Sequence, residues 1–323
     1  LQPDGSQLRG PPRNIAVDRI AFPLMSAQAF RSDETNQPLP RAERAYIEYG
    51  VPWLKDDIHA RFRGMTEDEI TALTRIQILG TANRFNGSPF YVTKIPDLIG
   101  LQDRRYLDAT ATHRNRGPED IARYAALVAS ADDGSIGPHR FFSDKQRRLT
   151  FHYSDTALYA LGRYIYALEP PPNPNPFDER ARRGEQIFRD EGCAKCHEPP
   201  TYTNNKLTRA DGFTVPDDHP DREHIMVRSV HTDPALALRT RKGTGLYKIP
   251  SLQGVWYRGV FEHSGSVATL EDWFDPKRLN PDYVPTGWKG PPGTTTRAVK
   301  GHEFGLDLSE DEREALIAFL RTL

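Results

Sequence analysis

Both cysteines of this 323-residue chain lie in one short run, Cys-Ala-Lys-Cys-His at residues 193–197. Two thiols three positions apart, followed directly by a histidine, are the attachment signature of a c-type haem. Cys193 and Cys196 can each add to one haem vinyl group, and His197 then reaches the iron from one side of the ring. The run therefore predicts one covalent haem c with His197 as the proximal iron ligand.

Three other interpretations of this run fit the chain less well. A redox-active Cys-x-x-Cys pair belongs in a thioredoxin-like βαβ unit, which the sequence does not indicate. A zinc site needs a second pair of ligands at metal spacing, and the chain has no further cysteine to supply one. A disulfide between Cys193 and Cys196 would close too short a loop to stabilise a fold.

Composition favours short helices joined by long loops. The chain has 27 Pro and 24 Gly, which interrupt regular structure, and its length leaves room for about two domains. Its net charge of -1 gives no basic surface for nucleic acid. A transmembrane helix requires about 18 consecutive apolar residues, and no stretch of the sequence approaches that length.

Haem attachment to Cys-x-x-Cys-His happens outside the bacterial cytoplasm, which predicts a periplasmic or extracellular protein. The chain begins at Leu1 without a basic, apolar leader, so we expect that an export signal has been removed. Its partners are then expected among redox proteins or in a membrane-associated complex.

A proline-rich run divides the chain. Five prolines lie between residues 170 and 176, where a helix cannot continue and extended polyproline geometry is favoured. We therefore expect an extended arm at 1–40, a first domain at 41–170, a linker at 171–177 and a haem domain at 178–323.

Helix signals flank the haem run. Asp178 caps a helix that ends at Gly192, and the last helix opens with a capping box of Ser309 and Glu312. Gly184 costs about 1 kcal/mol in the first of these helices, which predicts a close crossing with another helix. In the first domain we expect helices from Arg41 to Tyr49, from Thr66 to Leu79, from Gly117 onward and from Ser154 to Leu168.

Two similar stretches lie on either side of the linker. KIPDLIGLQDRRYLDATAT from Lys94 and KIPSLQGVWYRGVFEHSGS from Lys248 share Lys, Ile, Pro, Leu and Gly at matching places. They predict a mainly α fold of two cytochrome c-like domains with long loops. Near residues 50–58 the first copy carries GVPWLKDDI, without thiol or histidine, so we interpret it as a degenerate, haem-less copy in which Trp53 fills part of the vacated space. Chance similarity in a chain rich in Pro and Gly is the alternative.

The stretch YKIPSLQGVWYRGVFEHSGSVATLEDWF at residues 247–274 resembles the bacterial di-haem cytochrome c peroxidase superfamily, which also holds MauG-type enzymes and haem rubber oxygenases. The residues that match are Lys248, Pro250, Ser251, Leu252, Gly254, His263, Gly265, Ser266, Leu270 and Glu271. The resemblance is specific from about residue 180 onward and faint before Pro170. In this superfamily the N-terminal haem usually carries the peroxide chemistry and the C-terminal haem relays electrons. The resemblance therefore implies a chain that has lost its N-terminal haem site and kept the relay domain.

His302 is the candidate sixth iron ligand. The stretch at residues 294–308 contains no Met, the residue often used there, but it places His302 in a GHEFG context similar to the bis-His variant of rubber-oxygenase relatives. The alternative is a surface histidine beside Glu303. Two imidazole ligands give a lower reduction potential than His and Met. Met226, in an Ile-Met-Val run, is interpreted as core.

Other residues are expected around the haem. Lys248 and Arg258 are candidates to pair with haem propionates, and His263 is expected near a propionate, with iron ligation as its alternative. Trp256 is a candidate wall of the haem pocket, for which ordinary core packing is the alternative. The resemblance also implies a calcium ion between the two domains.

These expectations predict a mono-haem c-type cytochrome that passes single electrons, as a subunit of a larger redox assembly. A haem peroxidase or oxygenase acting at the single haem is the second hypothesis, and it requires an open iron position. A structural subunit with a haem too buried to exchange electrons is the third.

Overall fold

The structure is a computed structural model that describes residues 78–84, 88–129, 134–136, 139–140, 151–152, 154–240 and 243–323, together with Glu69 and Ala72. The expected arm, the helix from Arg41, most of the helix from Thr66, and Trp53 lie outside these residues. The described part is mixed rather than mainly α, because three small sheets accompany the helices.

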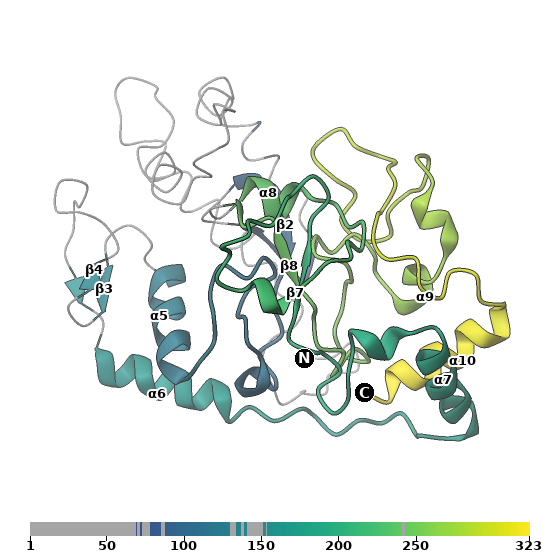
Figure 1. The fold of residues 1–323 in the computed structure, drawn as a ribbon, viewed down its shortest axis with the longest axis horizontal. Coiled ribbons are helices and arrows are strands. Elements are labelled where there is room, and N and C mark those ends of the chain that lie inside the picture. Colours follow the sequence, from purple (N-terminus) through teal and green to yellow (C-terminus); the bar gives the residue numbers. More distant parts are fainter. Residues whose placement is uncertain are drawn as a thin grey trace.

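The part before the linker combines a hairpin, a helix pair and a small sheet (Figure 1). Its elements are β1 (Thr81–Arg84), β2 (Ser88–Lys94), a 3-10 turn (Leu101–Asp103), α5 (Pro118–Ala129), β3 (Gly134–Ile136), β4 (His139–Arg140), β5 (Phe151–His152) and α6 (Asp155–Tyr166). The expected helices from Gly117 and from Ser154 are confirmed as α5 and α6. Ser154 caps α6 by accepting the Ala157 N–H at 3.2 Å.

The proline-rich segment after α6 has no regular structure and runs along the lower edge of Figure 1 to the next helix. Asn173 and Asn175 tie it to the last helix, because both side-chain amides donate to the Arg321 carbonyl, at 2.9 and 3.1 Å. The domain limits placed on either side of it stay a prediction.

The part after the linker is built from short elements joined by long loops. Its elements are α7 (Glu179–Asp190), a 3-10 turn (Cys193–Lys195), β6 (Leu207–Arg209), a 3-10 turn (Arg222–His224), β7 (Ile225–Met226), α8 (Ala235–Arg239), β8 (Leu246–Lys248), α9 (Leu270–Trp273), a 3-10 turn (Pro276–Leu279) and α10 (Glu310–Arg321). β6 lies between β7 and β8, parallel to the first and antiparallel to the second.

α7 and α10 cross at close range, as Gly184 predicts. A Cβ built on Gly184 would lie 2.8 Å from Phe319 Cβ and would collide with the Ala315 backbone, so no larger residue fits without moving a helix. Phe188 and Phe319 pack edge to face, 5.3 Å between ring centroids. Together with Leu316, these rings form the core beside the haem run. Both predicted caps are present, at Asp178 and at Ser309.

The two similar stretches share backbone geometry as well as sequence. Gly100 and Gly254, at matching positions, both have left-handed φ angles, 65° and 73°. The Leu107 N–H donates to His113 at 3.0 Å, and at the matching place the Phe261 N–H donates to Val267 at 2.6 Å. These repeated hydrogen bonds support the interpretation of the stretches as copies.

The two stretches also contact each other reciprocally. The Lys94 N–H donates to the His263 carbonyl at 2.8 Å, and the Lys248 N–H donates to the Ala109 carbonyl at 2.9 Å. The two donors, Lys94 and Lys248, occupy matching positions in the two stretches, and so do the two acceptors, His263 and Ala109. Each stretch therefore supplies the same backbone contact to the other, as two copies facing each other would.

Candidate haem site

The haem run lies on one tight turn directly after α7. Gly192, with a φ angle of 74°, ends the helix, and the Cys196 and His197 N–H groups both donate to the Cys193 carbonyl, at 3.1 and 2.9 Å. Both thiols are free and half-buried. Burial raises the pKa of Cys193 to about 11, so its thiol is neutral. The turn thus presents two unpaired sulfur atoms and the following imidazole together.

The His197 ring is held by hydrogen bonds to the backbone of Tyr202 and Pro250. Its Nδ1 lies 3.1 Å from the Tyr202 carbonyl, a contact that orients the ring. Burial lowers the pKa of His197, which favours the neutral imidazole. A histidine that donates Nδ1–H to a carbonyl keeps the lone pair of its other nitrogen for a metal.

His302 lies close to His197, although the two are far apart in the sequence. Burial lowers the pKa of His302 to about 3, and the next largest cause is the neighbouring His197. Its Nδ1 is buried and has no hydrogen-bond partner among the described residues. The edges of Trp273 and Phe304 enclose the ring, at centroid distances of 5.2 and 5.6 Å. These contacts do not fit the surface alternative.

Arg258 and Lys248 both contact the first stretch. Arg258 pairs with Asp97 at 3.6 Å and donates to the Ser251 carbonyl at 2.7 Å, and its charge contributes to the lowered pKa of His197. Lys248 Nζ donates to the Tyr106 and Leu107 carbonyls of the first stretch, both at 3.0 Å. Both residues therefore join the two stretches, and Arg258 lies within electrostatic range of His197 as well. Pairing of either with a propionate stays a prediction.

Trp256 is half-buried and packs edge to face on Tyr257, 5.0 Å between ring centroids. In the described part of the chain, the Trp256 ring does not pack against His197 or His302. Its role as a wall of the haem pocket stays a prediction.

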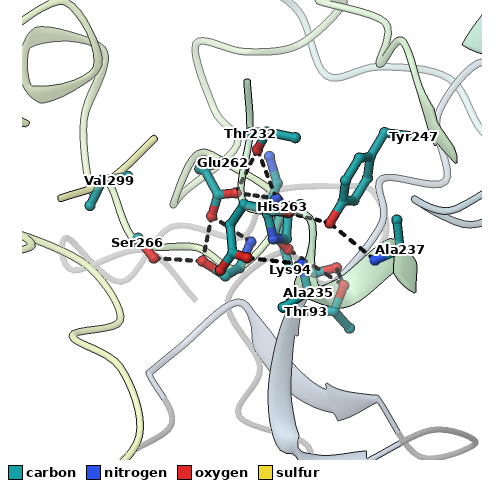
Figure 2. A network of polar contacts seen from close by, with 12 residues as sticks. Thr93, Lys94, Thr232, Ala235, Ala237, Tyr247, Glu262, His263, Ser266 and Val299 are labelled. Atoms are coloured by element: carbon teal, nitrogen blue, oxygen red, sulfur yellow. Dashed lines mark hydrogen bonds and ion pairs between the residues drawn. The ribbon is translucent and has the colours of Figure 1, made fainter. Parts of the chain in front are cut away.

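His263 belongs to a separate buried network, shown in Figure 2. Its Nδ1 pairs with Glu262 and lies 3.2 Å from Thr232 Oγ1, while its ring stacks on Tyr247 at 4.9 Å. Burial alone would raise the pKa of Glu262, but His263 and the hydrogen bonds of Ser264 outweigh it and lower the pKa to about 2. The His263 carbonyl accepts the Lys94 N–H, so this network contacts the first stretch. Its place near a propionate stays a prediction.

Calcium between the domains also stays a prediction. Among the described residues, no group of three or more His, Cys, Asp or Glu side chains is placed to hold a metal ion. At the contact between the stretches, two backbone carbonyls already accept the Lys248 ammonium.

Sequence reasoning missed three residues beside the site. Met226 lies with its sulfur 3.8 Å from the Cys196 sulfur, although its apolar neighbours indicated only core packing. Arg228 stacks on the Phe304 ring at 4.5 Å. Arg278, which no local pattern distinguishes from a surface arginine, is fully buried and donates to the His302 carbonyl.

Comparison with known proteins gives matches only in structure. No family model matches the chain, and no curated protein matches it significantly in sequence. A hydrazine synthase structure from Kuenenia stuttgartiensis aligns over 99% of this chain and 96% of that one, with 14% identity and a TM-score of 0.44. The diheme peroxidase BthA from Burkholderia thailandensis E264 aligns over 91% and 87%, with 18% identity and a TM-score of 0.37.

A MauG-like protein associated with microbial copper homeostasis aligns over 52% of both chains, with 19% identity and a TM-score of 0.34. The diheme peroxidase and the MauG-like protein are of the kind that the sequence resemblance names. At these identities and TM-scores the likeness is distant. A search of the described helices finds none with the length and apolar character to cross a bilayer.

Proposed function

We propose that this chain is a mono-haem c-type cytochrome that passes single electrons, as a subunit of a larger redox assembly. The observation that carries the proposal is that His302, packed against the rings of Trp273 and Phe304, lies within electrostatic range of His197, which directly follows the turn that holds both thiols. Burial lowers the pKa of both imidazoles, which favours the neutral form that can bind a metal.

The donor set fits haem c. Cys193 and Cys196 would form the two thioether bonds, and His197 and His302 would ligate the iron. The buried, unpartnered Nδ1 of His302 supports this fit, because a buried polar atom without a partner is costly in a site filled by protein alone. A haem bound here supplies a one-electron Fe(III)/Fe(II) couple.

The chain's own residues favour relay over catalysis. Two imidazoles leave no open iron position for oxygen or peroxide, and an iron with two protein ligands exchanges an electron with little rearrangement. Tyr202, Trp273 and Phe304 fix the two rings on several sides. Arg228 and Arg278 place positive charge near His302, which favours the reduced iron.

In this proposal the part before the linker serves as scaffold and docking surface. Lys248 and its partners in the first stretch join it firmly to the haem part, so the two would dock on a partner as one unit. We expect the protein to work in the periplasm or outside the cell, where its haem is attached and where its redox partners lie.

An optical spectrum of the purified holoprotein in both redox states tests the proposal. Two histidine ligands give a six-coordinate, low-spin haem in each state, and His302→Ala abolishes the low-spin spectrum of the ferric form. A wild-type protein with a high-spin haem that binds cyanide or peroxide readily would instead favour a peroxidase or oxygenase. If His302→Ala keeps the wild-type spectrum, the ligand assignment is wrong.

A further inference from the structure

Arg278 is the largest side chain that the described part of the chain buries completely. It lies in the 3-10 turn after α9, and its guanidinium group donates to three backbone carbonyls. Nε donates to Trp273 at 2.8 Å, Nη1 to Val299 at 2.9 Å and Nη2 to His302 at 2.6 Å. No carboxylate of the described residues lies within ion-pair distance of it. All three side-chain hydrogen bonds of Arg278 therefore go to backbone carbonyls, and two of the three go to the loop that carries His302.

Burying an arginine without a paired carboxylate is costly, because the charge loses its hydration. A guanidinium offsets that cost only where its planar fork meets several acceptors in fixed directions. Those acceptors belong to Trp273 of α9 and to residues 299–302, so one side chain bonds to two separate segments. The Val299 N–H also donates back to the Arg278 carbonyl at 2.6 Å, which attaches the loop to this turn a second time.

Packing fixes the same loop from the side. The Arg278 guanidinium lies 4.4 Å above the Trp273 ring, and the edge of that ring contacts His302. A Cβ built on Gly301 would lie only 2.9 Å from Trp273 Cη2, so the loop has no room to move towards the ring. Arg278 thus lies over the Trp273 ring, that ring packs edge to face with His302, and the His302 carbonyl accepts a hydrogen bond from Arg278.

We propose that Arg278 is the positioning residue that holds His302 in place as the sixth iron ligand. The inference rests on the proposed function, in which His302 binds the iron. Arg278 acts on the iron only through the His302 backbone and the Trp273 ring. Its removal should therefore release the ligand without removing the imidazole from the chain.

Arg297 provides a matched control. It is half-buried, whereas Arg278 is buried, and it too donates to backbone carbonyls, those of Lys289 at 2.8 Å and Ala298 at 3.3 Å, and lies 5.3 Å above a tryptophan ring, that of Trp288. Arg297 makes no contact with His302 among those the structure describes. Arg297→Gln therefore removes the same kind of interaction without removing a contact to His302.

The test compares Arg278→Gln, Arg278→Lys and Arg297→Gln as holoproteins, by ferric optical and electron paramagnetic resonance spectra and by carbon monoxide binding to the ferrous form. We expect Arg278→Gln to carry a mixture of high-spin and low-spin haem and to bind carbon monoxide at least tenfold faster than wild type. Added imidazole should restore its low-spin spectrum. Arg278→Lys keeps the charge but cannot reach three carbonyls, so its high-spin fraction and carbon monoxide binding rate should lie between those of wild type and Arg278→Gln. Arg297→Gln should match wild type in both measurements.

The inference is overturned if Arg278→Gln keeps a fully low-spin spectrum and the wild-type rate of carbon monoxide binding. If Arg278→Gln yields no folded holoprotein, Arg278→Lys decides by the same two measurements. If Arg297→Gln loses the ligand to the same extent, the effect is general loosening and Arg278 has no special role. His302→Ala separates the ligand assignment from the positioning role. A wild-type spectrum in that variant refutes His302 as the ligand. Loss of the ligand in His302→Ala but not in the Arg278 variants refutes only the positioning role of Arg278.

Discussion

The crossing of α7 and α10 gives the sharpest stability prediction, through Gly184→Ala. A new Cβ would lie 2.6 Å from the Ala315 carbonyl carbon and 2.8 Å from Phe319 Cβ, where ordinary contact is 3.4–4 Å. The nearest atoms are backbone, which cannot rotate away, so the helices must separate by roughly 1 Å in a close-packed core. A collision with backbone belongs in the upper part of the overpacking range, about 2–3 kcal/mol, and the better helix propensity of alanine returns about 1 kcal/mol.

The net expectation is a loss of about 1–2 kcal/mol in the free energy of unfolding, or roughly a 5- to 30-fold fall in the folded-to-unfolded ratio. Equilibrium denaturant unfolding of the holoprotein, followed by circular dichroism, measures it. Gln186→Ala, at an exposed site two residues further along α7, is the control and should change stability little. A Gly184→Ala protein as stable as wild type, with an unchanged haem spectrum, would show that the close crossing does not constrain the fold.

Further predictions concern the haem bonds, pH and the contact between the stretches. Cys196→Ala should leave one thioether bond, which shifts the pyridine haemochrome band, and an unshifted band would contradict covalent attachment at this residue. The pKa of Glu262 is lowered to about 2, so its carboxylate stabilises the fold above the unfolded-state value near 4.5 and this contribution is lost as pH falls from there towards 2. Thermal midpoints measured across that range should therefore fall more steeply for wild type than for Glu262→Gln. Parallel curves would show that Glu262 does not contribute to the acid dependence of stability. Lys248→Met leaves the Tyr106 and Leu107 carbonyls without their buried donor and should cost about 1–3 kcal/mol of unfolding free energy, with no change in the iron ligands. A changed spin state in Lys248→Met would instead place this lysine at the haem.

Local patterns in the sequence predicted the features that depend on neighbouring residues. The spacing from Cys193 to His197 placed both thiols and the imidazole on one turn, as the structure has them. Caps at Asp178 and Ser309 set the starts of α7 and α10, because a capping side chain bonds to N–H groups only two or three residues away. Gly184 predicted the close crossing because a mid-helix glycine is costly without a packing reason.

Features made by distant parts of the chain could not be read in this way. All but one of the described strands have only two to four residues, too short to show a clear alternating pattern, so the part of the chain that the structure describes is mixed where we expected mainly helices. Lys248 was expected at a propionate, but its partners come from the first stretch and no local signal identifies them. Arg278 gave no signal either, because all its side-chain acceptors are backbone carbonyls, whose position depends on the fold and not on residue type.

The reciprocal contact between the two stretches bears on the history of the chain. If the first copy is a haem-less duplicate, as its sequence predicts, selection for a cofactor no longer preserved it. Its Ala109, Tyr106 and Leu107 carbonyls nevertheless accept hydrogen bonds from the backbone and side chain of Lys248 in the other copy. Deleting the first copy would remove the carbonyls that accept these hydrogen bonds and would expose the face of the haem part that contacts them. Under this hypothesis the haem part depends on the first copy for its structure, and a copy without a haem would be retained as a structural requirement.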